Sequence, residues 1–164
     1  MNLKIRVILD AKKDVFRDIQ ISGKQNLLSF HRIVKEAFDL EGEEMASFYL
    51  SNENWFQGSE IPLENIFDEE GGETMAKIQL NEVMGQVGRR MIYVYDFFNM
   101  WTFFCETIER DEKEAATAVV YSYGKMPDKA PVKDTMDFFI EENEDEISPK
   151  RDDIFDDDDF NEYY

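Results

Sequence analysis

The segment that decides the fold is residues 91–108, which read MIYVYDFFNMWTFFCETI. Residues 91–97 and 101–108 are rich in aromatic and β-branched side chains, which favour β-strands. The short stretch between them has the length of a hairpin connection, and Asn99 tolerates the positive φ that tight turns require. We therefore predict two antiparallel strands joined by a turn at residues 98–100.

The aromatic side chains of this hairpin have two interpretations. Tyr93, Tyr95 and Trp101 fit cross-strand aromatic pairs, which would make them core residues without any ligand. The alternative is an aromatic surface that receives a partner or a ligand, with Asp96 orienting either the turn or that ligand. We keep these four residues, together with His31, as candidate partner-binding or ligand-binding residues.

The chain begins with a pattern typical of another β-hairpin. Residues 3–9 alternate apolar and polar side chains with the period of a half-buried strand. A polar stretch follows, and Val15, Ile19 and Ile21 predict a second strand beside the first, with Arg17 on the opposite face. Three basic side chains are expected to share the outer face of this hairpin: Lys4, Arg6 and Arg17.

Helix signals come next. Asn26 can cap a helix, and apolar residues then recur every three or four positions along one face: Leu27, Phe30, Val34, Ala37 and Phe38. Four shorter elements are predicted further on: a strand at residues 48–50, a helical turn at 62–67, a short helix at 80–84, and a last strand or helix end at 116–123.

These elements predict an α+β fold. We expect a roll with a ββαβ start, in which the helix packs on a mixed, mostly antiparallel sheet and the aromatic hairpin comes late. We place this single domain at residues 1–140. Residues 141–164 are predicted to form a separate acidic tail.

The charge of the chain is distributed unevenly. The sequence contains 37 Asp and Glu residues against 18 Lys and Arg residues, which gives a net charge of -19. Residues 1–38 carry +4, residues 39–133 carry -11, and residues 134–164 carry -12. Because acidic surfaces repel phosphates, a basic protein partner is favoured, and nucleic acid is retained only as a weak ligand of the basic N-terminal part.

The C-terminal residues 141–164 combine acidic and aromatic side chains. Like charges at this density repel one another and Pro149 interrupts helices, so we predict disorder. The tip looks like the acidic, aromatic tails that single-stranded-DNA-binding proteins offer to partner proteins; its candidate contact residues are Phe155, Asp156, Asp157, Asp158, Asp159 and Phe160. In two alternatives the tail serves solubility alone, or it covers the basic N-terminal hairpin and masks a weak nucleic-acid surface.

Few residues are suited to catalysis or metal binding. His31 is the only histidine, and we expect it to be packed or hydrogen-bonded at the edge of the core. One histidine and one cysteine, Cys105, cannot supply a typical zinc site, so we predict neither a metal nor a cofactor. The enzymatic alternative is a small hydrolase or ligand-binding enzyme centred on His31, Asp96 and Trp101.

The lone cysteine also bears on the location of the protein. Cys105 follows two phenylalanines, which predicts a buried thiol, and it cannot form an internal disulfide. We therefore expect a cytoplasmic protein. Since no apolar run approaches the roughly 20 residues that span a bilayer, we expect no membrane segment. The oligomeric state is left open.

The aromatic hairpin resembles a family signature. The Ri-plasmid ORF-three-like family, whose members are also called insertion-element passenger proteins, carries Tyr-x-Tyr-Asp-Phe-Gly-Asp-x-Trp-x-His. The matching residues are Tyr93, Tyr95, Asp96, Phe97 and Trp101. Phe98 replaces the glycine, Asn99 the aspartate and Phe103 the histidine. The stretch from Phe30 to Phe38 is similar to the family's Leu-His-x-x-Ile helix.

The resemblance implies a compact α+β roll associated with plasmids and mobile elements, and it adds regulation of mobile-element maintenance as a further possible role. Each departure from the signature at the hairpin introduces an apolar or neutral side chain. If the polar cluster of the family binds a metal or a substrate, we expect this chain to have lost that ability. The leading hypothesis is therefore a non-enzymatic interaction protein that presents an acidic surface and an aromatic, acidic tail to a basic partner.

Overall fold

The computed structural model describes residues 1–65 and 72–132. Met1–Pro131 form one compact unit, and the helices and strands below belong to it. The predicted tail at residues 141–164 lies outside the described residues. The proposed domain boundary at residue 140 lies outside them as well, so both stay predictions.

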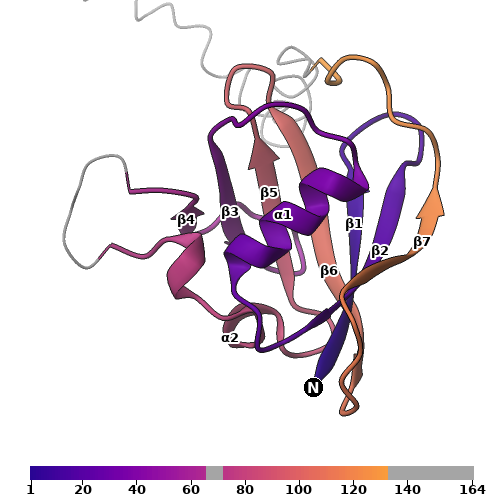
Figure 1. Cartoon of the computed structure of the whole chain (residues 1–164). Coiled ribbons are helices and arrows are strands. Elements are labelled where there is room, and N and C mark those ends of the chain that lie inside the picture. Colours follow the sequence, from indigo (N-terminus) through magenta and orange to yellow (C-terminus); the bar gives the residue numbers. More distant parts are fainter. Residues whose placement is uncertain (66–71, 133–164) are drawn as a thin grey trace, which may run out of the picture. The chain divides into compact units, whose positions relative to one another are not determined.

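A seven-stranded sheet forms the body of this unit (Figure 1). The strands are β1 Asn2–Leu9, β2 Phe16–Ser22, β3 Ala46–Ser51, β4 Glu60–Pro62, β5 Arg90–Tyr95, β6 Trp101–Asp111 and β7 Ala118–Tyr123. Their order across the sheet is β4-β3-β5-β6-β1-β2-β7, and all neighbouring pairs are antiparallel. The α+β fold class predicted from the sequence is confirmed.

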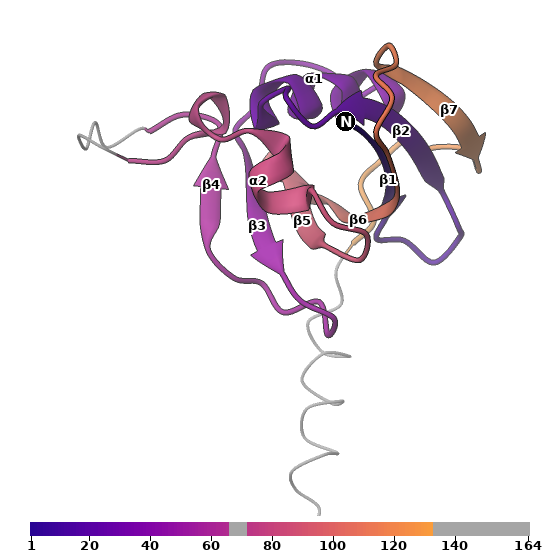
Figure 2. The same ribbon diagram turned by 90° about the horizontal axis from the view of Figure 1, so that it is seen from below.

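The helix α1, Leu27–Ala37, crosses one face of the sheet (Figure 1), and the sheet curves around it (Figure 2). Asn26 caps it, because the side chain accepts a hydrogen bond from the backbone N–H of Ser29 at 2.9 Å. Two short elements connect β4 to β5: a 3-10 helix at Met75–Lys77 and α2 at Leu80–Met84. The predicted cap and the predicted helix at residues 80–84 are both confirmed.

Aromatic rings join α1 to the centre of the sheet. Phe30 of the helix packs on Phe48 of β3 at 5.6 Å between ring centroids, and Phe48 packs on Tyr93 of β5 at 4.8 Å. Phe103 of β6 contacts Tyr93 at 5.8 Å and Phe38, just after the helix, at 4.6 Å. All five side chains are buried, so the core lies between the helix and strands β3, β5 and β6.

Both predicted hairpins are present. In β1 and β2, Ile5 lies opposite Ile19 and Leu3 opposite Ile21. In β5 and β6, the register is set by aromatic residues: Tyr93 opposite Phe103 and Tyr95 opposite Trp101. The last predicted element, for which a strand or a helix end was expected, is strand β7.

The expected face of Arg17 is wrong. Arg17 lies opposite the buried Val7, on the helix side of the sheet, whereas Lys4 and Arg6 lie on the other side. Residues two apart in a strand share a face, which places Arg17 with Ile19. Its guanidinium donates to the carbonyl oxygen of Ala37 at 3.2 Å and lies over the Phe38 ring, so the side chain belongs to the end of α1.

Two local predictions are also wrong. A helical turn was predicted at residues 62–67, but residues 60–62 form strand β4, paired with β3, and residues 63–65 are not helical; residues 66–67 lie outside the described part of the chain. In the β5–β6 turn the residues with positive φ are Asp96 and Met100, not Asn99. The Asp96 carboxylate explains the difference, because it accepts hydrogen bonds from the backbone N–H groups of Phe98 and Asn99 and thereby sets the turn.

Replacing one phenylalanine of the core tests this packing. Phe103→Ala removes a fully buried ring that contacts Phe38 and Tyr93, so we expect the free energy of unfolding to fall by about 3–5 kcal/mol. The matched control is Phe98→Ala, because Phe98 is 92% exposed and its loss should change stability by less than about 0.5 kcal/mol. Urea unfolding measures both, and equal losses would contradict the assigned core.

Candidate functional site

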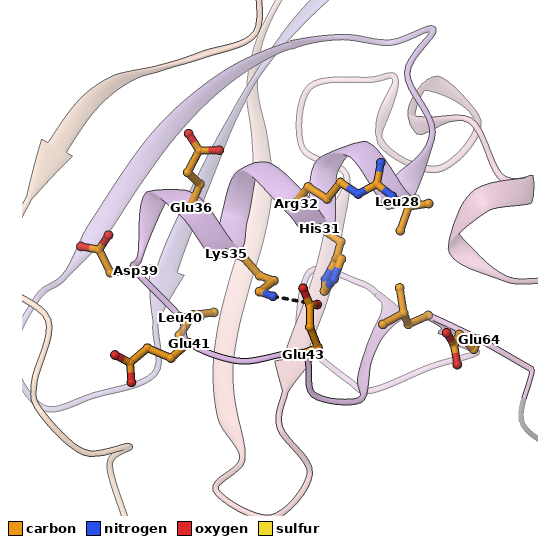
Figure 3. A pocket seen from close by; sticks show the side chains of 11 residues that line it. Leu28, His31, Arg32, Lys35, Glu36, Asp39, Leu40, Glu41, Glu43 and Glu64 are labelled. Carbon is orange, nitrogen blue, oxygen red and sulfur yellow. Dashed lines mark hydrogen bonds and ion pairs between the residues drawn. The ribbon is translucent and has the colours of Figure 1, made fainter.

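A cavity of about 800 Å³ lies beside α1 and is the candidate functional site (Figure 3). Its lining comes from α1, from the segment after it and from the residues that follow β4. Five of the lining residues are acidic: Glu36, Asp39, Glu41, Glu43 and Glu64. Two are basic, Arg32 and Lys35, and three are leucines, Leu28, Leu40 and Leu63. The remaining lining residue is His31. We call this cavity the acidic groove.

His31 forms part of the inner wall of the acidic groove. The residue lies on the buried side of α1 with Phe30 and Val34, and only 4% of it is exposed. Its Nδ1 atom is 2.6 Å from the hydroxyl oxygen of Tyr93. Either tautomer of the neutral ring forms this bond, since the hydroxyl can donate to a bare Nδ1 or accept from Nδ1–H. The histidine is therefore packed and hydrogen-bonded at the core edge.

Burial controls the protonation of both partners. The pKa of His31 is lowered from 6.5 to about 4, chiefly by burial and also by the nearby Lys35, while Glu43 opposes the shift. Burial also raises the pKa of the Tyr93 hydroxyl well above its usual value. At neutral pH the imidazole and the phenol are both uncharged. His31 thus contributes a neutral polar surface to a groove whose charge comes from its other residues.

Tyr95 and Lys35 hold residues 41–43, the segment after α1 that carries Glu41 and Glu43 at the acidic rim of the groove. The Tyr95 hydroxyl lies 2.7 Å from the carbonyl oxygen of Glu41 and 2.8 Å from that of Gly42. The Lys35 ammonium donates to the Gly42 carbonyl at 2.6 Å and to the Glu43 carboxylate at 3.2 Å. Gly42 has φ +79°, a conformation that a side chain would strain. The rim is therefore anchored to both β5 and α1.

The Lys35–Glu43 pair is drawn as a dashed line in Figure 3. Among the groove residues that the structure describes, it is the one ion pair. It neutralises one acid and one base, so the remaining lining keeps four carboxylates against Arg32. The groove has a net negative charge at neutral pH.

The candidate residues of the hairpin occupy different places. The structure brings His31 together with Tyr93 and Tyr95, whose rings lie 5.8 Å and 6.4 Å from the imidazole. Asp96 accepts hydrogen bonds from its own turn, including one from the Asn99 side-chain amide at 2.6 Å. Trp101 lies opposite Tyr95 and is half-buried against the core. Within the described residues, no hydrogen bond, ion pair or ring contact joins Asp96 or Trp101 to His31.

The lone cysteine and the tail residues, the other candidates from the sequence, lie away from the acidic groove or outside the described residues. Cys105 is fully buried, and burial raises the pKa of its thiol. The tail residues Phe155 to Phe160 lie outside the described part of the chain. In residues 1–65 and 72–132, no group of three or more His, Cys, Asp or Glu side chains is arranged to hold a metal ion. No helix in the same ranges is long and apolar enough to cross a membrane.

Sequence reasoning missed the carboxylates of the acidic groove. The excess of negative charge in residues 39–133 indicated an acidic surface but not its location. Only Glu36 and Asp39, three positions apart at the end of the helix, could have been assigned to one face from spacing. Glu64 joins them because β4 pairs with β3, and that pairing was not predicted.

Comparisons with known proteins agree with this architecture. Residues 1–160 match the profile of a family described as plasmid pRiA4b ORF-3-like protein. A crystal structure of a protein of unknown function from Methanosarcina mazei Go1 is similar, with a TM-score of 0.62 and 16% sequence identity over 93% of this chain and 86% of that one. At this identity the likeness shows the fold alone. No curated protein matches the chain.

The His31–Tyr93 contact can be tested by removing one oxygen atom. Tyr93→Phe leaves a buried imidazole nitrogen without its partner, so we expect the free energy of unfolding to fall by about 1–3 kcal/mol. Tyr121→Phe makes the same chemical change at a side chain that is 52% exposed, and it should change stability by less than about 0.5 kcal/mol. Equal unfolding midpoints in urea for wild type and Tyr93→Phe would contradict this role.

Proposed function

This chain belongs to the plasmid pRiA4b ORF-3-like protein family, and from that premise we propose that it is a non-enzymatic interaction protein whose acidic groove receives a basic segment of a partner protein. The family description names a plasmid reading frame and no activity, so the function is argued from the residues. The observation that carries the proposal is the lining of the groove, in which five carboxylates outnumber two basic side chains.

The shape and chemistry of the groove suit lysine and arginine. A concave wall with an excess of negative charge concentrates the electric field and raises the local concentration of cations. The three leucines, Leu28, Leu40 and Leu63, offer apolar surface for the aliphatic stems of long basic side chains, while the surrounding carboxylates attract their charged ends. The partner class is therefore a protein segment that contains several Lys or Arg residues.

The chemistry of His31 supports binding better than catalysis. A general base works best when its pKa lies near the working pH, whereas burial holds the pKa of His31 at about 4. The one cysteine is fully buried with a raised pKa, which disfavours the thiolate that a nucleophile needs. The hydrolase alternative, centred on His31, Asp96 and Trp101, lacks a contact that joins its members and stays an alternative.

The nucleic-acid alternative has less support than it had from the sequence. Lys4 pairs with Glu109 at 3.1 Å, and Arg6 forms two hydrogen bonds with Asp18 at 2.8 and 2.9 Å. Arg17 lies on the other face of the sheet. Because these cations are neutralised or turned away, they offer phosphates no continuous basic surface.

The acidic C-terminal residues form the second part of the proposal. Residues 134–164 contain 14 acidic and 2 basic residues, and their aromatic side chains would add contact area on a partner. Their charge has the same sign as the groove, so both would steer the same basic partner. We also propose a cytoplasmic location, on the ground of the lone cysteine, and leave mobile-element maintenance as a role supported by family association alone.

A labelled peptide that alternates lysine and leucine is the probe for the groove. Glu36→Gln combined with Glu64→Gln removes two charges from the lining with little change in shape, and we expect the affinity for the peptide to fall about tenfold. The matched control is Glu53→Gln combined with Glu73→Gln, two exposed acids outside the groove, for which we expect less than about a twofold change. Fluorescence anisotropy at low and high salt measures both.

Two outcomes decide this prediction. Equal losses in the two double variants would mean that the peptide responds only to the total charge of -19, and the groove proposal would fail. The same titration with a chain shortened to residues 1–137 separates the tail from the groove. If binding is unchanged by the shortening but lost in the groove variant, the tail has no part in recognising this probe.

A further inference from the structure

Only one of the two ring nitrogens of His31 has a partner inside the protein. Nδ1 lies 2.6 Å from the hydroxyl oxygen of Tyr93. Among the described residues, no group forms a hydrogen bond or an ion pair with the other nitrogen, Nε2. The nearby Glu43 carboxylate accepts from Lys35 at 3.2 Å and is not bonded to the imidazole. His31 therefore keeps one polar atom without a partner.

This nitrogen opens into the acidic groove. Two polar side-chain atoms in the described part of the chain are sealed from solvent without a hydrogen bond, Asn2 Oδ1 and Arg90 Nε, and Nε2 of His31 is not one of them. The residue is only 4% exposed and lines the groove, so the small exposed part includes Nε2. Figure 3 shows the His31 side chain directed from α1 toward the segment of Glu43. A buried side chain thus presents one free nitrogen on the inner wall.

The Tyr93 hydroxyl determines which nitrogen carries the hydrogen of the neutral ring. Tyr93 is fully buried, and within the described residues His31 Nδ1 is the one hydrogen-bond partner of its hydroxyl. If Nδ1 carried the hydrogen, the phenolic hydrogen would have no acceptor, and an unsatisfied buried donor costs free energy. With a bare Nδ1 the hydroxyl donates to it, and the ring carries its hydrogen on Nε2. The groove therefore faces an N–H donor.

The charge of the groove selects the acceptor for this donor. Outside the Lys35–Glu43 pair, four carboxylates line the groove against Arg32, so it repels carboxylates and phosphates. A neutral oxygen is accepted, and each residue of a basic protein segment carries one in its backbone carbonyl group. A polyamine has positive charge but no such oxygen. The same nitrogen therefore distinguishes a basic peptide from a bare cation.

We propose that His31 is the specificity-determining residue of the acidic groove, and that its Nε2–H donates a hydrogen bond to a backbone carbonyl oxygen of the basic segment. The carboxylates attract the Lys and Arg side chains, while this hydrogen bond holds the main chain of the segment against the inner wall. The inference rests on the proposed function of the groove. It adds that the ligand is recognised as a peptide and not by charge alone.

The position of the ring hydrogen is measured first, in the protein without any ligand. NMR of the full-length, isotope-labelled protein at neutral pH distinguishes the two ring nitrogens of the one histidine. We expect the hydrogen on Nε2 and a bare Nδ1. A hydrogen on Nδ1 would overturn the proposal, and it would leave the proposed function of the groove untouched.

Two cationic probes then test the hydrogen bond: the lysine–leucine peptide and spermine, which has no carbonyl group. His31→Phe removes the donor and keeps an aromatic ring. We expect the affinity of the full-length protein for the peptide to fall about fivefold, the effect of one neutral hydrogen bond, and that for spermine to change less than about twofold. The matched control is Tyr121→Phe, outside the groove and 52% exposed, which should bind both probes like the wild type. Calorimetric titration measures every affinity.

The outcomes separate this proposal from the function on which it rests. Equal losses for the two probes, or no loss for either, would overturn the role of His31 while the groove stays a cation site. Peptide binding that does not respond to Glu36→Gln with Glu64→Gln would refute the proposed function and this inference with it. Should His31→Phe not fold, the wild-type Nε2–H resonance is followed instead: a shift with the peptide and none with spermine supports the hydrogen bond, and equal responses refute it.

Discussion

The packing of α1 on the aromatic rings of strands β3, β5 and β6 is the contact on which the rest of the structure depends. An isolated helix of 11 residues is marginal in water, so its stability must come from its buried face. Phe30 and Phe38 meet Phe48 and Phe103 at ring distances of 5.6 and 4.6 Å, and Tyr93 links the two contacts. The helix is thereby fixed over the middle of the sheet.

The acidic groove follows from this packing. Since His31 adjoins Phe30, the helix that buries the phenylalanine also carries the imidazole to the Tyr93 hydroxyl. The next turn brings Lys35 to the segment that Tyr95 anchors, and the same helix presents Glu36 at the rim. A neutral inner wall with an acidic rim suits the binding role that we propose, because the attraction for a basic segment would come from the carboxylates and not from the protonation of His31.

Much of the fold could be predicted from the residue pattern, because the spacing of apolar side chains along the chain indicates which residues are buried. The alternation in residues 3–9, the Asn26 cap and the aromatic hairpin each depend on neighbours close in sequence, and each was predicted correctly. One error arose where a distant strand pairing decides the structure, and another where a side chain forms hydrogen bonds within its own turn. Pro62 joins a strand because β3 pairs with it. Asp96 takes the positive φ because its own carboxylate receives the turn amides.

The acidic groove was beyond such prediction for the same reason, since its carboxylates come from three segments that only the folded sheet assembles. The most direct test of the central claim is the NMR titration of the one histidine in this chain, followed while the amide spectrum stays that of the folded protein. Its pKa should lie near 4, so that the ring stays neutral from pH 7 down to acid conditions. A pKa at or above 6.5, the ordinary value for histidine, would mean an accessible imidazole and would contradict a neutral, buried wall behind the acidic rim.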